Sequence, residues 1–358
     1  MTVAEVPRRA QIVGTGLIGG SVGLALAALG WHVTGADHDP GAVSTALGRG
    51  AIHEAGSDPQ AELVVIALPV GAVVDAARAA LIDHPMAVVT DVGSVKAHIV
   101  ASLDDPRFVG GHPMAGSEQE GAAGSDASMF RGAVWALTPT PTTDGDAYAT
   151  LHSVVSALGA EVVTLDAADH DQVVAMISHV PHLTAATLMR LASGRASTQA
   201  PLLRMAAGGF RDMTRIAAGH PGIWPDICAE NRGAIVTVLD DLIAELGAVR
   251  DTVATADRSR LLADLEGARA ARLNLPTTAG RPDELAEIRV TVPDEPGQLA
   301  AVTTLATELG VNIYDIELAH SAEGPRGVMI LVIDVDAVPA ITDGLETRGY
   351  HVSSRGVS

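Results

Sequence analysis

The most constraining feature of the sequence is a glycine-rich turn near the N-terminus, set between an apolar strand and an apolar helix. Residues 9–13 form a short apolar run that leads into Gly14-Thr15-Gly16-Leu17-Ile18-Gly19-Gly20. A helix is expected over 21–29 and a second strand over 32–36. A strand, a G-x-G-x-x-G turn, a helix and a strand that ends in an acid are typical of a dinucleotide-binding unit.

Each glycine of this turn has a separate physical role. Gly14 is predicted to make the tight turn, and Gly16 to let the backbone approach a pyrophosphate. Gly19 is predicted to allow close packing of helix on strand. Leu17 and Ile18 stand at the helix start, where free N–H groups and the positive end of the helix dipole favour phosphate. The alternative is a glycine-rich turn without a ligand.

The cofactor predicted from this pattern is NAD. Asp37 ends the second strand, where it would accept hydrogen bonds from the ribose hydroxyls and repel a 2′-phosphate. The neighbouring His38, if protonated, would tolerate some phosphate, so preference for NAD over NADP stays open. Leu68 and Pro69 end a later strand and are predicted to form the crevice wall against a cofactor ring.

Further apolar runs alternate with helical patterns up to residue 166. Strands are expected over 63–68, 87–92, 133–137 and 161–165, separated by short turns and helices. Such alternation is typical of a parallel, doubly wound sheet. We therefore expect an α/β class with a Rossmann-type domain over 1–166.

Two polar residues follow the strand over 87–92. Ser94 is interpreted as a helix N-cap, as a hydroxyl in the crevice where nicotinamide meets substrate, or as both. Lys96, the sole lysine, falls in the first helical turn, where the helix dipole disfavours a cation. An ordinary solvated lysine is the default interpretation of Lys96, with an electrostatic role as the alternative.

One histidine stands in a glycine-flanked loop, Gly110-Gly111-His112-Pro113-Met114-Ala115-Gly116-Ser117-Glu118. Glycines let a backbone approach a ligand, and Pro113 fixes the local φ. A loop just past a strand of an α/β sheet is where such folds place their chemistry. His112 is therefore a candidate catalytic residue, and the alternative is a turn whose histidine is merely exposed.

The pattern from 167 to 272 is helical only. His179 and His182 are three residues apart and would share a helix face, kinked by Pro181. No third ligand stands at a zinc-motif spacing, so we expect one substrate contact and one structural histidine, and no metal. Asp212 and Arg215 fall within one helical turn; Arg215 is either a surface ion pair or a planar fork for a substrate carboxylate.

The rest of the chain predicts a subunit interface and a separate domain. An amphipathic helix over 225–246 is expected to pack against a second copy in a homodimer. Residues 273–285 are rich in Pro, Thr, Gly and Asp and are interpreted as a linker. The strand and helix pattern over 286–358 follows the βαββαβ order of a ferredoxin-like fold.

Composition narrows the possible partners. The 358-residue chain carries a net charge of −20, so it has no generic attraction for nucleic acid or an anionic membrane. A single cysteine, Cys228, and the lack of a signal-like N-terminal pattern predict a cytoplasmic protein. An anionic ligand would need a few well-placed cations.

Several separate motifs over residues 9–271 together resemble the prephenate/arogenate dehydrogenases, the TyrA dehydrogenases of tyrosine synthesis. They are GTGLIGGS, DVGSVK, GGHPMAGSE, SHVPH and GGFRDMTRIA followed by Trp224. The tail resembles an ACT domain through DEPGQLA and the segment Val311-Asn312-Ile313-Tyr314. The resemblance implies a Rossmann domain, an all-helical dimerisation domain and an ACT regulatory domain.

The resemblance also implies roles for particular residues. His112 would accept the proton of the ring hydroxyl of prephenate, and Ser94 would hydrogen-bond in the same crevice. Arg215 would hold the ring carboxylate, and His182 is a better candidate than His179 for a substrate contact. Asp212 matches a position that supports the substrate contacts, and Trp224 matches a wall of the pocket. An effector, tyrosine or phenylalanine, would bind near Asp294, Pro296, Gly297, Gln298, Leu299 and Asn312.

Three other functions remain open at this point. Arogenate dehydrogenase differs only in an amino side chain on the substrate, which no motif here identifies. A β-hydroxyacid dehydrogenase would need a helix lysine beyond the nucleotide domain, whereas Lys96 lies inside it. A sensor of nucleotide and amino acid without turnover would have no use for His112 and Arg215 together.

Overall fold

The computed structural model describes residues 7–116, 119, 121–196, 203–274, 285–293, 295–320 and 326–356. The chain divides into two compact units, residues 1–245 and 246–358. Among the described residues, no helix combines the length and the apolar character that crossing a bilayer requires.

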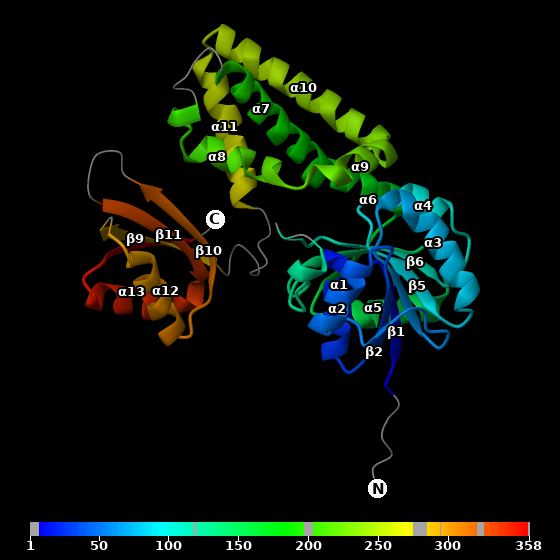
Figure 1. Ribbon diagram of the computed structural model, residues 1–358. Coiled ribbons are helices and arrows are strands. Elements are labelled where there is room, and N and C mark those ends of the chain that lie inside the picture. The colour runs from blue at the N-terminus through cyan, green and yellow to red at the C-terminus, as the bar shows by residue number, and fades with distance from the viewer. Residues whose placement is uncertain are drawn as a thin grey trace. The chain divides into compact units, whose positions relative to one another are not determined.

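The first unit is built on an eight-stranded sheet with the order β3-β2-β1-β4-β5-β6-β7-β8 (Figure 1). In the middle of the sheet, Ile12 pairs with Gly35 on one side and Val65 on the other, both in parallel register. The strands are β1 (Arg9–Val13), β2 (His32–Ala36), β3 (Glu54–Ala55), β4 (Leu63–Ile66), β5 (Val88–Asp91), β6 (Phe108–Pro113), β7 (Val134–Thr138) and β8 (Glu161–Thr164).

The prediction of a wholly parallel sheet is wrong at one place, because β7 runs antiparallel to β6. Parallel neighbours need a crossover connection, usually a helix. In the described part of the β6–β7 connection, the only helical segment is the short 3₁₀ turn Ala122–Gly124. The chain therefore turns back beside β6, so that His112 pairs with Ala136 of β7.

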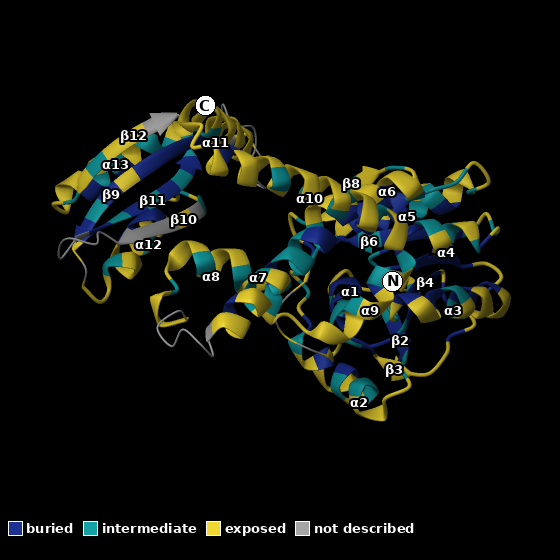
Figure 2. Ribbon diagram, turned by 90° about the horizontal axis from the view of Figure 1, so that it is seen from above, coloured by how far each residue is buried: buried dark blue, intermediate teal, exposed yellow. Residues whose placement is uncertain are grey.

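Helices cover both faces of this sheet because its central strands are apolar on both sides. Leu63 and Val65 pack with α1, α2 and α5, whereas Val64 and Ile66 pack with α3 and α4. Figure 2 shows buried strands between helices whose outer sides are exposed. The helices are α1 (Leu17–Ala28), α2 (Pro40–Arg49), α3 (Val70–Asp83), α4 (Ala97–Ala101) and α5 (Gly145–Ala157).

A helical segment follows the sheet. A π-helical turn over Ala175–His179 joins α6 to α7 without a break, just before Pro181, and the kink expected at Pro181 stays a prediction. The single helix expected over 225–246 is two helices, separated at Asn231. The elements are α6 (Ala167–Val174), α7 (Val180–Ala196), η3 (Leu203–Met205), α8 (Gly208–Thr214), η4 (Arg215–Ala218), η5 (Pro221–Ile223), α9 (Trp224–Glu230) and α10 (Arg232–Ala254).

In the described part of the second unit, the helix α11 precedes an antiparallel four-stranded sheet with the order β10-β11-β9-β12, and the helices α12 and α13 pack on that sheet. Its strands and helices follow the βαββαβ order expected from the sequence. The core joins the sheet to two helices through Ile288, Leu331, Leu305 and Ile341. The elements are α11 (Arg258–Leu273), β9 (Leu285–Pro293), α12 (Gln298–Glu308), β10 (Ile313–His320), β11 (Arg326–Asp334), η7 (Val335–Ala337), α13 (Val338–Thr347) and β12 (His351–Gly356).

Candidate active site

A cavity of about 430 Å³ lies in the first unit, where the segments that follow β1, β4 and β5 meet the end of β6. The strand order reverses between β1 and β4, and ligands of open α/β sheets bind at such a switch point. The cavity brings together these residues that the sequence analysis singled out: Gly16, Leu17, Ile18, Leu68, Pro69, Ser94 and His112.

The glycine turn has the geometry that its sequence predicts. Gly14 has φ +95°, and a Cβ on it would lie 2.2 Å from the carbonyl oxygen of Ala67. A Cβ on Gly19 would lie 1.9 Å from the carbonyl oxygen of Gly14, so the close packing of α1 excludes any side chain there. Nothing lies within 4 Å of a Cβ built on Gly16, which leaves its backbone open to a ligand.

Asp37 stands beside this turn and does not line the cavity. Its carboxylate accepts hydrogen bonds from the backbone N–H groups of Thr15 (2.7 Å) and Asp39 (3.0 Å). It also lies 3.0 Å from Nδ1 of His38. Asp37 therefore holds the shape of the turn, a role that the sequence analysis did not foresee, and its binding of ribose stays a prediction.

His112 lies partly buried at the end of β6 and begins a chain of hydrogen bonds. Its Nδ1 is 2.9 Å from Nε2 of His170, and Nδ1 of His170 is 2.8 Å from Oδ1 of Asp171. His170 and Asp171 are buried on α6. The sequence analysis missed both residues, although a histidine and an acid side by side near the end of the nucleotide domain were a visible signal.

This arrangement fixes which nitrogen of His112 can act as a base. A carboxylate only accepts hydrogen bonds, so in the neutral chain His170 carries its proton on Nδ1 and presents Nε2 as an acceptor. His112 then donates from Nδ1 to His170, and its Nε2 is left without a proton. We infer from this network that Nε2 of His112 is the basic atom.

The surroundings keep this imidazole neutral. Burial is the largest cause that lowers the pKa of His112 well below its usual 6.5, followed by the neighbouring His170, Lys96 and His179. A neutral imidazole is the form that accepts a proton. His112 is therefore available as a base throughout the neutral pH range.

The structure corrects two interpretations of the segment after β5. Helix α4 begins at Ala97, and the carboxylate of Asp171 accepts from the backbone N–H groups of Lys96 (2.7 Å) and Ala97 (2.9 Å). Ser94 is therefore not the N-cap; it lines the cavity. Lys96 is not solvated, because its side chain is 0% exposed and pairs with Asp91.

The two helical histidines have different environments. His179 is buried, and its Nδ1 lies 3.2 Å from Nδ2 of Asn231; burial lowers the pKa of His179 to about 4. His182 is half-buried and stacks on Trp224, with ring centroids 3.7 Å apart. Helix α9, which begins at Trp224, contributes Asp226 and Ile227 to the cavity.

Arg215 and Asp212 are not among the described residues that line the His112 cavity. Arg215 is exposed at the start of η4, and a Cβ on Gly219, just past η4, would lie 3.8 Å from Cε1 of His182. Asp212 instead lines a separate apolar cavity of about 600 Å³ between α7, α8 and α10. Their joint placement with His112 stays a prediction.

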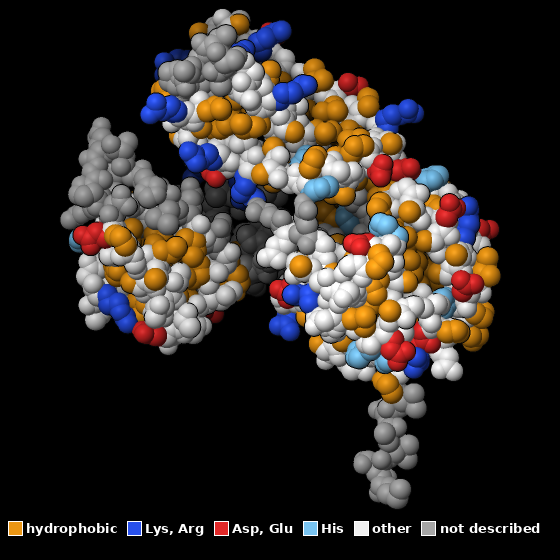
Figure 3. Space-filling view, in the orientation of Figure 1, with side chains coloured by type: hydrophobic (Ala, Val, Ile, Leu, Met, Phe, Trp, Pro, Cys, Tyr) orange, Lys and Arg blue, Asp and Glu red, His pale blue; other side chains and the backbone are white. Residues whose placement is uncertain are grey.

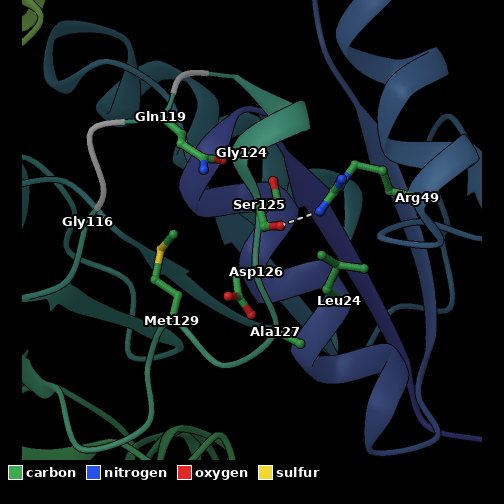
Figure 4. A pocket seen from close by; sticks show the side chains of 9 residues that line it. All are labelled: Leu24, Arg49, Gly116, Gln119, Gly124, Ser125, Asp126, Ala127 and Met129. Carbon is green, nitrogen blue, oxygen red and sulfur yellow. Dashed lines mark hydrogen bonds between the residues drawn. The ribbon is translucent and has the colours of Figure 1, made fainter. Parts of the chain in front are cut away.

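A further cavity, of about 480 Å³, lies beside the described part of the loop that follows His112 (Figure 4). Ser125 fixes this loop to the glycine turn, since its Oγ donates to the carbonyl oxygen of Leu17 (3.2 Å). The guanidinium of Arg49 on α2 donates to the backbone oxygen of Ser125 (2.6 Å). The backbone N–H of Asp126 donates to Ser21 of α1 (3.0 Å). The loop after His112 is therefore attached to the helix that begins at the glycine turn.

The predicted effector residues lie in the second unit. Gly297 has φ +94° and precedes α12, and Oε1 of Gln298 accepts a hydrogen bond from Tyr350 (2.8 Å). Asn312 stands just before β10. Pro296 and Leu299 lie on either side of the α12 start, whereas Asp294 lies outside the described residues.

A switch-point cavity that joins an open glycine turn to a histidine base defines a nucleotide-dependent oxidoreductase of the Rossmann class. The family model for the nucleotide-binding domain of prephenate dehydrogenase matches residues 22–164. The model for the dimerization domain of prephenate dehydrogenase matches residues 166–266. The chain belongs to the prephenate dehydrogenase family.

Individual relatives agree with this membership. The prephenate dehydrogenase of Bacillus subtilis (strain 168) is 33% identical over 261 residues, which are 71% of this chain and 70% of the relative. The crystal structure of prephenate dehydrogenase from A. aeolicus, in complex with hydroxyphenyl propionate and NAD+, is 28% identical with a TM-score of 0.72. It covers 76% of this chain and 100% of its own. Synechocystis arogenate dehydrogenase is 31% identical with a TM-score of 0.66, over 74% of this chain and 98% of its own.

Proposed function

We propose that this chain is an NAD-dependent prephenate dehydrogenase, which converts prephenate to 4-hydroxyphenylpyruvate in tyrosine biosynthesis. The observation that carries the proposal is the hydrogen-bond chain from His112 through His170 to Asp171, which begins in the cavity that also contains the open glycine turn. Family membership supports the same reaction. The related A. aeolicus enzyme was crystallised with NAD+ and a hydroxyphenyl compound.

The described residues fit NAD. The backbone at Gly16 is open, and the first turn of α1 has neither a side-chain cap nor an acidic residue to repel a pyrophosphate. Leu68 and Pro69 line the cavity and would form an apolar wall for a ring. Asp37, which holds the glycine turn through the N–H of Thr15, is proposed to bind the ribose hydroxyls. When bound, NAD accepts a hydride from the carbinol carbon of the substrate.

Side chains of this protein accept the proton of the substrate hydroxyl and stabilise the positive charge that results. Nε2 of His112 takes the hydroxyl proton of the ring as the carbinol carbon becomes a carbonyl, and Ser94 hydrogen-bonds in the same cavity. His170 and Asp171 stabilise the proton on His112. The ring carboxylate then leaves as CO2, and the electron pair of the broken C–C bond aromatises the ring while the carbonyl oxygen takes back a proton to become the phenol. Loss of CO2 makes the step essentially irreversible. General-base help of this kind contributes about 10²–10⁴-fold.

Steady-state rates on prephenate and on arogenate, each with NAD and with NADP, test the proposal. Formation of reduced NAD with prephenate supports it. A clear preference for arogenate would change the substrate but not the mechanism, and Synechocystis arogenate dehydrogenase makes that the first alternative. A folded protein that binds NAD but turns over neither substrate would instead support the sensor function.

Arg215 is proposed to hold the ring carboxylate. The segment that carries Arg215 supports this role, because Gly219, just past η4, lies close to His182. His182 stacks on Trp224, and the helix α9 that begins at Trp224 reaches the cavity. A hydrogen bond to a charged group contributes about 1.5–3 kcal/mol, so we expect Arg215→Ala to raise KM for prephenate about 10-fold to 100-fold with little change in kcat.

Arg78→Ala, which removes an exposed arginine on α3, is the control for the change at Arg215 and should leave KM unchanged. Initial rates over a range of prephenate concentrations measure both variants. If KM of Arg215→Ala barely moves, Arg215 is a surface ion-pair residue and another group holds the carboxylate.

A homodimer through the helical segment is proposed as well. Large apolar side chains are exposed there, among them Met176, Ile177, Met213 and Ile243. Hydrophobic side chains gather on this part of the first unit in Figure 3. Exposed apolar patches of this kind mark interaction sites, and the dimerization-domain match covers the same residues.

We further propose that residues 286–358, which lie in the second unit, form an ACT regulatory domain that binds tyrosine or phenylalanine near Gly297 and Asn312. Its βαββαβ order supports this assignment. Isothermal calorimetry should give measurable heat with one of the two amino acids. Asn312→Ala should weaken binding about 2-fold to 10-fold through loss of a neutral hydrogen bond.

Thr347→Ala, on the exposed side of α13, is the matched control for the effector site. It should bind the amino acid like the unchanged protein. Absence of heat with every aromatic amino acid would contradict the effector proposal and leave the catalytic one untouched.

A further inference from the structure

The dehydrogenase mechanism leaves one buried charged pair without a role. Lys96 and Asp91 are both 0% exposed, and Nζ of Lys96 contacts Oδ2 of Asp91. Burying an ion pair costs several kcal/mol of desolvation per ion, and apolar residues of the same volume often stabilise a protein equally well. A buried pair beside a candidate base therefore invites a functional explanation.

Asp91 connects the two segments that carry Ser94 and His112. Its Oδ2 accepts from the backbone N–H of Gly93 (2.8 Å), and its Oδ1 accepts from the N–H of Gly111 (3.2 Å). The backbone ladder between β5 and β6 ends at Thr90 and Val109. Beyond these residues, the side chain of Asp91 connects β5 to β6 through its hydrogen bond with Gly111, the residue before His112.

The two glycines before His112 lie against the segment that carries this pair, where no side chain fits. A Cβ on Gly110 would lie 3.3 Å from Cδ of Lys96, as well as 2.5 Å from Oγ1 of Thr138. A Cβ on Gly111 would lie 2.8 Å from the carbonyl oxygen of Asp91. Both glycines are therefore required by the close packing of β6 on its neighbours, which include Lys96 beside Gly110 and the backbone of Asp91 beside Gly111.

Lys96 also reaches the hydrogen-bond chain behind His112. Its backbone N–H donates to Oδ1 of Asp171, the same oxygen that His170 contacts through Nδ1. The side chain of Lys96 thus contacts Asp91, which holds Gly111 of β6. Its backbone N–H contacts Asp171, the last member of the His112–His170–Asp171 relay. One residue is connected to both supports of the catalytic imidazole.

We propose that the buried Lys96–Asp91 pair is a positioning device for the dehydrogenase reaction, which holds His112 and the Ser94 segment in place and keeps a positive charge beside the imidazole. The proposal rests on the proposed role of His112 as the base. Asp91 supplies the geometry, because it fixes Gly93 and Gly111. Lys96 supplies the charge and neutralises Asp91.

The sign of the electrostatic effect follows from the groups that face His112. They are Lys96 at the start of α4, Asp91 on β5, His170 and Asp171 on α6, His179 in the π turn and Asp226 on α9. Lys96 is among the groups that lower the pKa of His112. Removal of the Lys96 charge therefore raises the pKa of His112. His112 then becomes protonated, and stops acting as a base, at a higher pH than in the unchanged enzyme.

Lys96→Met tests the proposal, since methionine retains an unbranched side chain without the charge. We expect kcat to fall about 10-fold to 100-fold, as a small misplacement of a catalytic group can cost that much, while KM for NAD stays within about 2-fold. The acidic limb of the pH profile of kcat should move to higher pH. The pKa of His112, measured by NMR of ¹⁵N-labelled histidine, should also rise.

Arg9→Met is the matched control. Arg9 begins β1 at the opposite end of the strand from the glycine turn and pairs with the buried Asp58 at 2.6 Å. Removal of this cation should lower thermal stability without moving the acidic limb. If Lys96→Met behaves like Arg9→Met, with unchanged kcat and pH profile, the pair is only structural and the proposal is overturned.

The double variant Asp91→Asn with Lys96→Met serves if the single variant does not fold, because no unpaired buried charge remains. The proposal expects the folded double variant to retain the loss in kcat, and full activity would overturn it. Failure of the proposed function is a separate result: the unchanged protein would then turn over neither substrate. In that case the NMR titration of His112 in Lys96→Met still tests the electrostatic effect.

Discussion

We expect His112→Asn to lower kcat by about 10²–10⁴-fold while NAD still binds with nearly unchanged affinity. The loss follows because Nε2 of His112 is the atom placed to accept the proton, and an amide does not act as a base at neutral pH. NAD binding should survive because the glycine turn and Asp37 belong to β1, α1 and β2, whereas His112 belongs to β6. Single-turnover rates and fluorescence titration with NAD measure the two quantities.

The pH profile of the unchanged enzyme belongs to the same prediction. Because burial and its neighbours lower the pKa of His112, kcat/KM should stay level through neutral pH and decline only well below 6.5. This decline at acidic pH should be absent from the pH profile of the residual activity of His112→Asn. His152→Asn, an exposed histidine on α5, is the control and should alter neither rate nor profile. Unchanged turnover in His112→Asn would remove this residue from the mechanism.

The second large effect is expected from Asp171→Asn. An amide whose nitrogen takes the place of Oδ1 donates to Nδ1 of His170, which places the histidine proton on Nε2 and reverses the hydrogen bond to His112. This orientation gives up the hydrogen bond from the N–H of Lys96, whereas the reverse orientation gives up the one from the N–H of Ala97. Nε2 of His112 would then carry a proton and could not accept the one from the substrate. A wrong tautomer of this kind costs up to about 10⁴-fold in the serine-protease relay, and we expect a loss in kcat of about 10²–10⁴-fold here.

Asp166→Asn is the matched control for the change at Asp171, because Asp166 is the N-cap of the same helix α6 and accepts from the N–H of Ala168 (2.8 Å). It repeats the acid-to-amide change without touching the relay, so kcat should stay close to that of the unchanged enzyme. NMR of the histidine nitrogens should show the tautomer change only in Asp171→Asn. A loss in kcat of less than 2-fold in Asp171→Asn would show that the relay does not set the base.

Short-range patterns allowed much of the site to be predicted. The roles of Gly14 and Gly19 follow from spacing within one strand–turn–helix unit, and the structure shows both close approaches. His112 and Ser94 were candidates because each follows a strand of the same sheet, and parallel strands end at a common edge. The cavity unites both with the glycine turn.

Long-range partners could not be predicted in this way. His170 and His112 are 58 residues apart, and Lys96 and Asp171 are 75 apart, so no local pattern connects them. Lys96 was therefore interpreted as solvated, although an acid five residues earlier in the chain pairs with it in the interior. The antiparallel β7 escaped prediction for a related reason, since strand direction depends on the path of the connecting loop.

The sequence alone determined the alternation of strands and helices up to residue 166, the βαββαβ order of residues 286–358, the nucleotide turn and the candidate base, because each depends on residues close together in the chain. Only the tertiary structure decided which nitrogen of His112 is basic and how the imidazole stays neutral. Those properties come from hydrogen bonds and burial supplied by β5, α4 and α6, which meet around His112 only when the sheet is complete.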